Sequence, residues 1–217
     1  MPRMRTKEGQ TDIQQTTFSP KFAIIEPGVY LARVSAATQA TFVSNGGQKY
    51  LKIRPVVTLF NENGTEISNQ DLIVGAVDEN DVLFQPDEKK RAEGVSPVWS
   101  EALFFMASLG FEDVEDFAVE LVTGQIVVVS VVTEEYTSKN GQSGKKNVVG
   151  YRRSNGKTGG GFFAVNEERH ADWIKEHDLF QKDGAWWVDE NDYDAYQSAM
   201  EKLDEEDDEP VQDDDIL

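Results

Sequence analysis

The chain has 217 residues and a formal net charge of −19, with 39% hydrophobic and 10% aromatic residues, a composition typical of a folded protein rather than a disordered one. It contains no cysteine, which excludes disulfide scaffolds, thiolate zinc sites and cysteine nucleophiles. No apolar run approaches the ~18 residues of a membrane span, and the polar N-terminus lacks the apolar segment of a secretory signal, so we expect a cytoplasmic protein without a membrane partner.

The first predicted elements are a polar arm and three strands. Residues 1–21 are polar, which predicts a flexible N-terminal arm. Glycine-containing segments at 44–47 and 61–64 predict turns. Alternation of apolar and polar residues around these turns predicts strands at 28–34, 50–60 and 66–74.

A helix and a β-hairpin follow a charged stretch at 78–94. Ser96-Pro97 is typical of a helix start, with serine as the N-cap and proline at the first helical position, and Gly110 is typical of a helix end. This helix is expected to bury Trp99, Leu103 and either Met106 or Ala107. Two strands at 125–135 and 147–153, with a turn at 139–142, then predict a hairpin.

The order of three strands, one helix and two strands is the order of an OB-fold, a five-stranded Greek-key barrel with a helix that bridges the third and fourth strands. We therefore predict a mainly β protein with an OB-like core at residues 22–160. A flexible glycine-rich link at 154–161 leads to a helical and aromatic extension at 161–203. In this extension we expect helices at 167–180 and 193–203 and a short strand at 186–188.

Acidic residues are concentrated at the C-terminal end. Residues 1–160 carry 17 Lys and Arg against 20 Asp and Glu, a net charge of −3, whereas residues 161–217 carry 4 against 20, a net charge of −16. The nearly neutral core is therefore free to carry local basic patches. Residues 204–217 are too charged to fold alone, which predicts a disordered acidic tail. The tail ends with carboxylates and an apolar tip: Asp213, Asp214, Asp215, Ile216 and Leu217.

Basic and aromatic residues are interleaved on two of the predicted elements. Tyr50, Lys52 and Arg54 are two residues apart on one strand, so their side chains share one face. Single-stranded nucleic acid is bound by such sets, because bases stack on aromatic rings while cations contact phosphates. The simpler interpretation is a set of solvated surface cations, but the order of elements and the tail favour a binding role. The last hairpin adds Tyr136, Lys139, Lys145, Lys146, Tyr151, Arg152 and Arg153.

Other motifs favour structural roles. Gly150 and Gly156 are separated by five residues instead of the four of a phosphate-binding P-loop, which we therefore exclude. His170 and His177 are seven residues apart, too far to share one metal ion, and are expected on the surface. No nucleophile–base pair stands out, so we expect neither catalysis nor a cofactor. Four aromatic residues lie among acidic ones and are expected to pack against the barrel instead of contacting phosphate: Trp186, Trp187, Tyr193 and Tyr196.

With its strand and helix order over residues 22–155 and its acidic tail at 204–217, the chain resembles bacterial and phage single-stranded-DNA-binding proteins. In that family an OB-fold precedes an acidic tail with a hydrophobic end, and the tail recruits replication and repair proteins and competes with DNA for the basic groove. Bacterial members usually end in Pro-Phe and many phage members in Phe, whereas this chain ends in Ile216-Leu217. The segment at 162–203 is an addition to the simple bacterial form.

The resemblance implies sequence-tolerant binding of single-stranded DNA during phage DNA replication, recombination or repair, in the cytoplasm of the infected host. The tail would recruit replication or recombination proteins, or occupy the DNA groove, and its deletion would then tighten DNA binding. Two alternatives are an acidic phage protein that mimics DNA and a phage structural or assembly protein that does not bind nucleic acid. The oligomeric state stays open, a homo-oligomer included.

Overall fold

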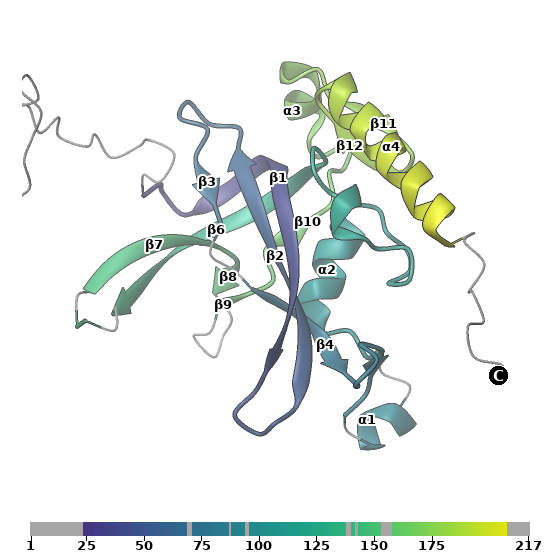
Figure 1. Ribbon diagram of the computed structural model, residues 1–217. Helices are drawn as coiled ribbons and strands as arrows, with labels where there is room; N and C mark the ends of the chain where they lie inside the picture. The colour runs from purple at the N-terminus through teal and green to yellow at the C-terminus, as the bar shows by residue number, and fades with distance from the viewer. Residues whose placement is uncertain are drawn as a thin grey trace, which may run out of the picture.

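The computed structural model describes residues 24–68, 71–86, 88–93, 96–137, 140–141, 143–152 and 158–207. Across these ranges the protein is mainly β, and one strongly curled sheet forms an open half-barrel (Figure 1). The strand order is β10-β6-β1-β2-β4-β5, with β3 paired to β2 and β7 paired to β6. These eight strands are β1 (Gly28–Val43), β2 (Lys49–Leu59), β3 (Glu66–Ile67), β4 (Leu72–Val77), β5 (Leu83–Phe84), β6 (Ile126–Thr137), β7 (Ser143–Val149) and β10 (Phe162–Phe163).

The other described elements surround this sheet. Two small hairpins pair β8 with β9 and β11 with β12. They comprise β8 (Tyr151–Arg152), β9 (Thr158–Gly159), β11 (Phe180–Lys182) and β12 (Ala185–Trp187). The helices are α1 (Glu88–Ala92), α2 (Ser100–Ser108), the 3₁₀-helix η2 (Val119–Leu121), α3 (Ala171–Glu176) and α4 (Glu190–Asp207).

The curl of the sheet depends on β1, which is 16 residues long. Residues 28–33 of β1 pair with β6, and residues 32–43 pair with β2. The register with β2 shifts between Val34 and Ala36, and such an irregularity bends a strand. Helix α2 contacts β10, at one end of the strand order, and β4, next to the other end, and so covers the open side of the half-barrel (Figure 1).

The main core lies between the sheet and α2. Alternate residues of β2 point into it, as expected for a strand, so that Ile53 and Val57 are almost completely buried. Helix α2 adds Phe105 and Met106, which are neighbours on the helix face that also buries Ala102. The ring of Phe105 packs edge-to-face on Phe162 of β10 at a centroid distance of 4.8 Å, which joins α2 to the far end of the sheet.

Strand β6 is buried on both faces. Val127 and Val129 belong to the main core, whereas Ile126 and Val128 point to the opposite side. There they pack with Leu31 and with apolar residues of the C-terminal extension: Val165, Trp173, Ile174, Leu179, Trp186 and Val188. The extension thus packs directly on the sheet, which explains why the β6 sequence is apolar at consecutive positions.

Helix α2 begins later than its sequence predicts. The Oγ of Ser96, the predicted N-cap, accepts the N–H of Val98 at 3.1 Å, and the helix starts at Ser100. The N–H of Trp99 donates to the carbonyl oxygen of Val74 in β4 at 2.7 Å, so the connection is held to the sheet edge before the helix can begin. Met106 is buried as predicted, but the prediction that Trp99 is buried is wrong, because it is 49% exposed.

Several other predicted boundaries differ from the structure. The third predicted strand is divided into β3 and β4, and the charged stretch at 78–94 contains β5 and α1. The helix expected at 167–180 is limited to the six residues of α3. Helix α4, expected at 193–203, runs from Glu190 to Asp207 and so includes the first residues of the segment expected to form the tail.

The glycine-rich segment, expected to be a flexible link, is packed at its C-terminal end. Gly159, Gly160 and Gly161 are buried, and β9 begins at Thr158. Gly161 has a φ of +107°, and a Cβ added to it would lie 2.4 Å from the backbone nitrogen of Gly150. Glycine is therefore required at this position for close backbone packing rather than for flexibility. Strand β10, just beyond residue 160, belongs to the main sheet.

No helix within the described ranges combines the length and the apolar character that crossing a membrane requires.

Candidate nucleic-acid interface

One face of β1, β2 and β4 points away from the main core and carries a row of aromatic residues. We call it the outer face. Phe42 of β1 lies opposite Tyr50 of β2, Tyr50 lies opposite Ala76 of β4, and Ala76 lies opposite Phe84 of β5. The rings of Phe42 and Tyr50 stack at a centroid distance of 5.5 Å with an interplanar angle of 23°. The row follows directly from the pairing register of the long β1–β2 hairpin.

Trp99 extends this aromatic row beyond β4. Its ring meets Tyr50 edge-to-face at a centroid distance of 6.3 Å. The hydrogen bond between its backbone N–H and Val74 fixes this position at the edge of β4. Phe42, Tyr50 and Trp99 form what we call the outer-face cluster. Sequence reasoning missed Phe42 and Trp99, although the predicted turn at 44–47 places residues 42 and 50 at nearly matching distances from its centre.

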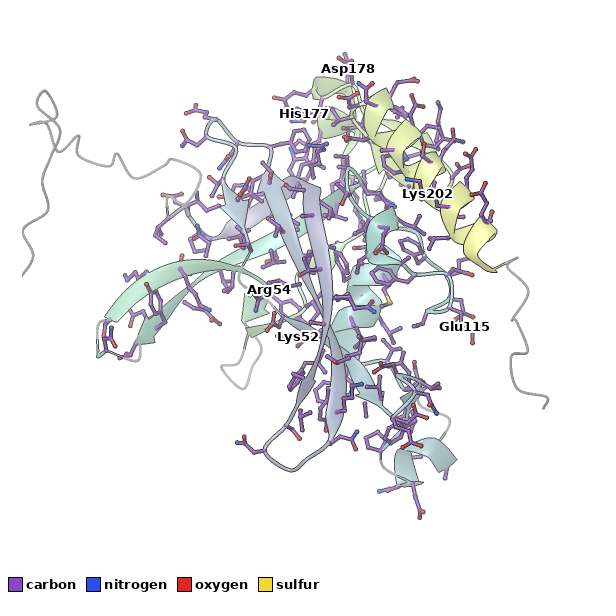
Figure 2. The ribbon with its side chains drawn as sticks, viewed as in Figure 1. Lys52, Arg54, Glu115, His177, Asp178 and Lys202 are labelled. Atoms are coloured by element: carbon purple, nitrogen blue, oxygen red, sulfur yellow. The ribbon has the colours of Figure 1, made fainter. Side chains whose placement is uncertain are left out.

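Lys52 and Arg54 lie on the outer face beside this cluster, as their spacing predicts. Figure 2 shows both side chains leaving β2 on the same side. They face Ala40 and Thr38 of β1 across the hairpin, and these small side chains leave the cations accessible. The Nζ of Lys52 lies 5.7 Å from the ring centroid of Phe42, so the cation is directly next to the rings.

A carboxylate lies between these two cations. Oδ2 of Asp71 lies 3.0 Å from Nζ of Lys52, and Oδ1 accepts a hydrogen bond of 2.6 Å from Nε of Arg54. The hydrogen bond from Arg54, followed by that from Lys52, holds the pKa of Asp71 below its usual value, against the effect of partial burial. The same contact raises the pKa of Arg54. Lys49, at the start of β2, pairs with Asp81 at 2.5 Å.

Three of the residues predicted on the last hairpin, Tyr136, Lys145 and Lys146, lie on a separate structure, the arm formed by β6 and β7 (Figure 1). Glu134 lies opposite Lys146 and Glu135 opposite Lys145, so the two lysines point to opposite faces of the arm. Lys145 is weakly paired with Glu135 at 3.8 Å. Tyr136 is 46% exposed.

Two tyrosine rings near this arm cover glycines. A Cβ added to Gly144 would lie 2.9 Å from the ring of Tyr136, and one added to Gly160 would lie 2.7 Å from the ring of Tyr151. Both rings still have large exposed fractions, 46% for Tyr136 and 42% for Tyr151. The remaining predicted residues lie outside the described part of the chain: Lys139, Arg153, the side chain of Arg152, and the tail residues Asp213, Asp214, Asp215, Ile216 and Leu217.

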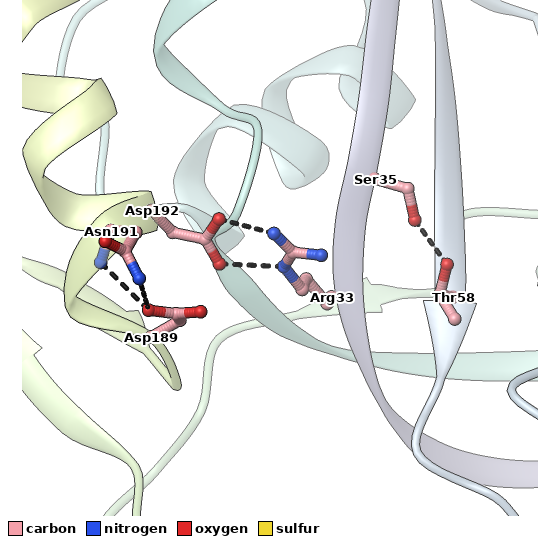
Figure 3. A network of polar contacts seen from close by, with 6 residues as sticks. All are labelled: Arg33, Ser35, Thr58, Asp189, Asn191 and Asp192. Atoms are coloured by element: carbon pink, nitrogen blue, oxygen red, sulfur yellow. Dashed lines mark hydrogen bonds and ion pairs between the residues drawn. The ribbon is translucent and has the colours of Figure 1, made fainter.

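Arg33, also on β1, has a structural role instead. Figure 3 shows its guanidinium group facing the carboxylate of Asp192 on α4, with Nε donating to Oδ2 at 2.9 Å and a second bond to Oδ1. Next to this pair, Oδ1 of Asp189 accepts two hydrogen bonds from Asn191, one from the backbone N–H at 2.9 Å and one from the side-chain amide at 2.7 Å. These hydrogen bonds lower the pKa of Asp189. These contacts fix the start of α4 against the sheet.

Of the extension's aromatic residues, Trp186 packs against the sheet, as predicted, whereas the other three pack against one another within the extension. Trp187 is completely buried, and its ring meets Tyr193 and Tyr196 at centroid distances of 5.7 and 5.2 Å. Trp186 packs against the second hydrophobic cluster beside the sheet. The hydroxyl of Tyr193 donates to Oδ2 of Asp183 at 2.8 Å. We call Trp187, Tyr193 and Tyr196 the extension cluster.

The two histidines lie at the ends of α3. Nδ1 of His170 accepts the backbone N–H of Asn166 at 2.9 Å, and its ring stacks on Trp173. Burial, and then the charge of Arg169, lowers the pKa of His170. Across the described ranges, no three His, Asp or Glu side chains gather in a way that would hold a metal ion.

The side of the β1–β2 hairpin opposite the outer face borders a cleft of about 550 Å³. Its walls include the apolar residues Leu51, Val74 and Phe117, and three carboxylates also line it: Asp81, Asp113 and Glu115. Anionic phosphates are repelled by such a rim, so the outer face is the better candidate for binding nucleic acid.

Comparison with protein-family models and with curated proteins finds no match to this chain.

Proposed function

We propose that the protein binds single-stranded DNA in a sequence-tolerant manner through the outer face of β1, β2 and β4. The observation that supports this most directly is the outer-face cluster, in which exposed or half-exposed rings lie beside Lys52 and Arg54 on one surface. Bases stack on such rings whatever their identity, at about 1–3 kcal/mol for each base, while neighbouring cations contact the phosphates. No catalytic step or cofactor is part of this proposal.

The strand pairing supports an OB-like interpretation of the half-barrel. β1 pairs with β2 and with β6, β2 pairs with β4, β6 pairs with β7, and α2 lies between β4 and β6 in the chain. In chain order, we assign β1, β2, β4, β6 and β7 to the five strands of an OB-fold, with α2 as the bridging helix. In OB-folds the face of the second and third strands binds oligonucleotides. In this assignment that face is the outer face of β2 and β4.

The proposed role is in phage DNA replication, recombination and repair, in the cytoplasm of the host cell. The acidic C-terminal tail would recruit replication or recombination proteins through its carboxylates and through Ile216 and Leu217. Because α4 continues to Asp207, the deletion that removes the tail without shortening this helix begins at residue 208.

Fluorescence anisotropy with a labelled poly-dT strand of ~30 nucleotides, at two salt concentrations and with duplex competitor, tests the proposal. We expect salt-sensitive binding that prefers the single strand, since cations that contact phosphates release counterions. The protein without residues 208–217 serves as the second sample, because the tail would compete for the same cations. Absence of binding by both proteins at low salt would refute the proposal.

A second candidate function, mimicry of DNA, is supported by α4. Between Glu190 and Glu205 this folded helix carries six acidic residues and one lysine, a density of charge that resembles a phosphate backbone. Such a protein would inhibit a host enzyme that binds nucleic acid and would not bind DNA itself. The anisotropy experiment therefore separates the two functions.

A further inference from the structure

The carboxylate of Asp71 occupies the position at which a phosphate would contact Lys52 and Arg54. Each of its two oxygens contacts one cation, at 3.0 Å for Lys52 and 2.6 Å for Arg54. A phosphate group would use two oxygens in the same way, because both groups are anions that accept charge-assisted hydrogen bonds. These two cations of the outer face are thus already partly neutralised by the fold.

The backbone fixes Asp71 in this position. Ile53 of β2 lies opposite Leu72, the first residue of β4, so the next pair along the two chains consists of Arg54 and Asp71. Lys52, two residues before Arg54 on the same face of β2, lies opposite Ile73, and its Nζ reaches the same carboxylate.

All three charged groups are in contact with water. The exposed fractions of the side chains are 24% for Lys52, 50% for Arg54 and 35% for Asp71. Ion pairs exposed to this degree contribute little to stability, because water and salt screen them. A single DNA strand, with its closely spaced phosphates, can therefore displace Asp71 without unfolding the surrounding β-sheet.

We propose that Asp71 is a built-in competitor of DNA phosphate at Lys52 and Arg54, which weakens the binding of single-stranded DNA and reduces its dependence on salt. This inference rests on the proposed function and assigns a regulatory residue to the same surface. The Asp71 carboxylate pairs with both cations when no DNA is bound, and phosphate groups of a bound DNA strand replace it.

The variant Asp71→Asn tests this inference in the full-length protein, by poly-dT anisotropy titrations over a series of salt concentrations. Without the carboxylate, Lys52 and Arg54 can make about one additional phosphate contact. This contact should tighten DNA binding by roughly 5- to 10-fold at ~50 mM salt and steepen the slope of log affinity against log salt by about 0.7. Asp71→Glu retains the carboxylate and should bind about as wild type does. Asp194→Asn, which removes one exposed charge from α4, is the matched control and should not change the salt slope.

The same substitution in a Lys52→Gln/Arg54→Gln background separates local competition from general repulsion. In this background Asp71→Asn should no longer tighten binding, because its two cationic partners are absent. If wild type binds the strand and Asp71→Asn binds equally tightly, or tightens binding in both backgrounds, the inference is wrong while the proposed function stands. If neither wild type nor Asp71→Asn binds, the proposed function itself fails. Circular dichroism and thermal unfolding of each variant show that the compared proteins are folded.

Discussion

The outer-face cluster and the extension cluster are built from the same kinds of residue, yet their environments differ. Each contains a tryptophan, tyrosine and a nearby lysine: Lys52 lies 5.7 Å from the Phe42 ring, and Lys182 lies 4.4 Å from the Tyr193 ring. Trp99 of the first cluster is 49% exposed, whereas Trp187 of the second is completely buried. The first is a surface available to a ligand, and the second is the core of a small packed unit.

The difference shows that interleaved aromatic and basic residues do not by themselves indicate a binding site. The lysines of both clusters face a carboxylate, Lys182 that of Glu190 and Lys52 that of Asp71, but the rings of the extension are packed together. On the outer face, the pairing register places the rings on neighbouring strands, and Trp99, at one edge of the row, is bonded to β4 through its backbone N–H. Burial and register, rather than residue type, distinguish the two clusters.

The largest effect that tests this comparison is expected for Trp187→Ala. Removing a completely buried tryptophan should destabilise the extension by about 3–5 kcal/mol, because it leaves a cavity among Tyr193, Tyr196 and Phe180. Urea unfolding measures the loss, with Trp99→Ala as the matched control, for which we expect a loss of about 1 kcal/mol or less. Equal losses for the two variants would mean that the clusters do not differ in structural role.

An effect of intermediate size is expected for DNA binding by Trp99→Ala. If Trp99 stacks on a base, its removal should weaken poly-dT binding by about 5- to 150-fold, corresponding to the 1–3 kcal/mol of a stacked base. Phe104→Ala is the matched control, because Phe104 lies on α2, is 54% exposed and is outside the aromatic row. Anisotropy titrations at one salt concentration give the poly-dT affinity of each variant. A similar loss for the two variants would assign binding to general surface hydrophobicity instead of the outer-face cluster.

The parts of this surface that depend on local pattern could be predicted from sequence. The shared face of Tyr50, Lys52 and Arg54 follows from the period of a strand, and the turn that precedes them follows from its glycines, Gly47 having a φ of +82°. The mainly β character and the packing of Trp187 follow from similar local reasoning about alternation and charge.

The parts that depend on distant contacts could not be predicted. Ser96-Pro97 has the local features of a helix start. In the structure the backbone N–H of Trp99 instead bonds to Val74, the helix begins at Ser100, and the tryptophan lies on the surface. Asp71 gives no local signal, because its partners belong to another strand and meet it only through the register of β2 and β4. Gly161 suggests flexibility in isolation, whereas the approach of Gly150 makes it a packing residue.

The smallest predicted effect concerns the ionisation of tyrosines in the extension cluster. The hydrogen bond to Asp183 raises the pKa of Tyr193, and burial, followed by the charge of Asp183, raises the pKa of Tyr196. The neutral phenols are thus favoured in the folded protein, so their contribution to stability is fully present below the ordinary pKa of 10.0 and is lost as the pH rises through the folded values.

Alkaline titration of the phenolate absorbance follows the ionisation of all six tyrosines, Tyr193 and Tyr196 among them. In wild type, part of the tyrosine signal should appear above the ordinary pKa, and Asp183→Asn should move that part downward because the neighbouring negative charge is lost. Asp194→Asn, at an exposed position of α4, the helix that carries both tyrosines, should leave the titration unchanged. A wild-type titration without a delayed component would show that these rings are open to water in solution. The packing contrast between the extension cluster and the outer-face cluster would then disappear.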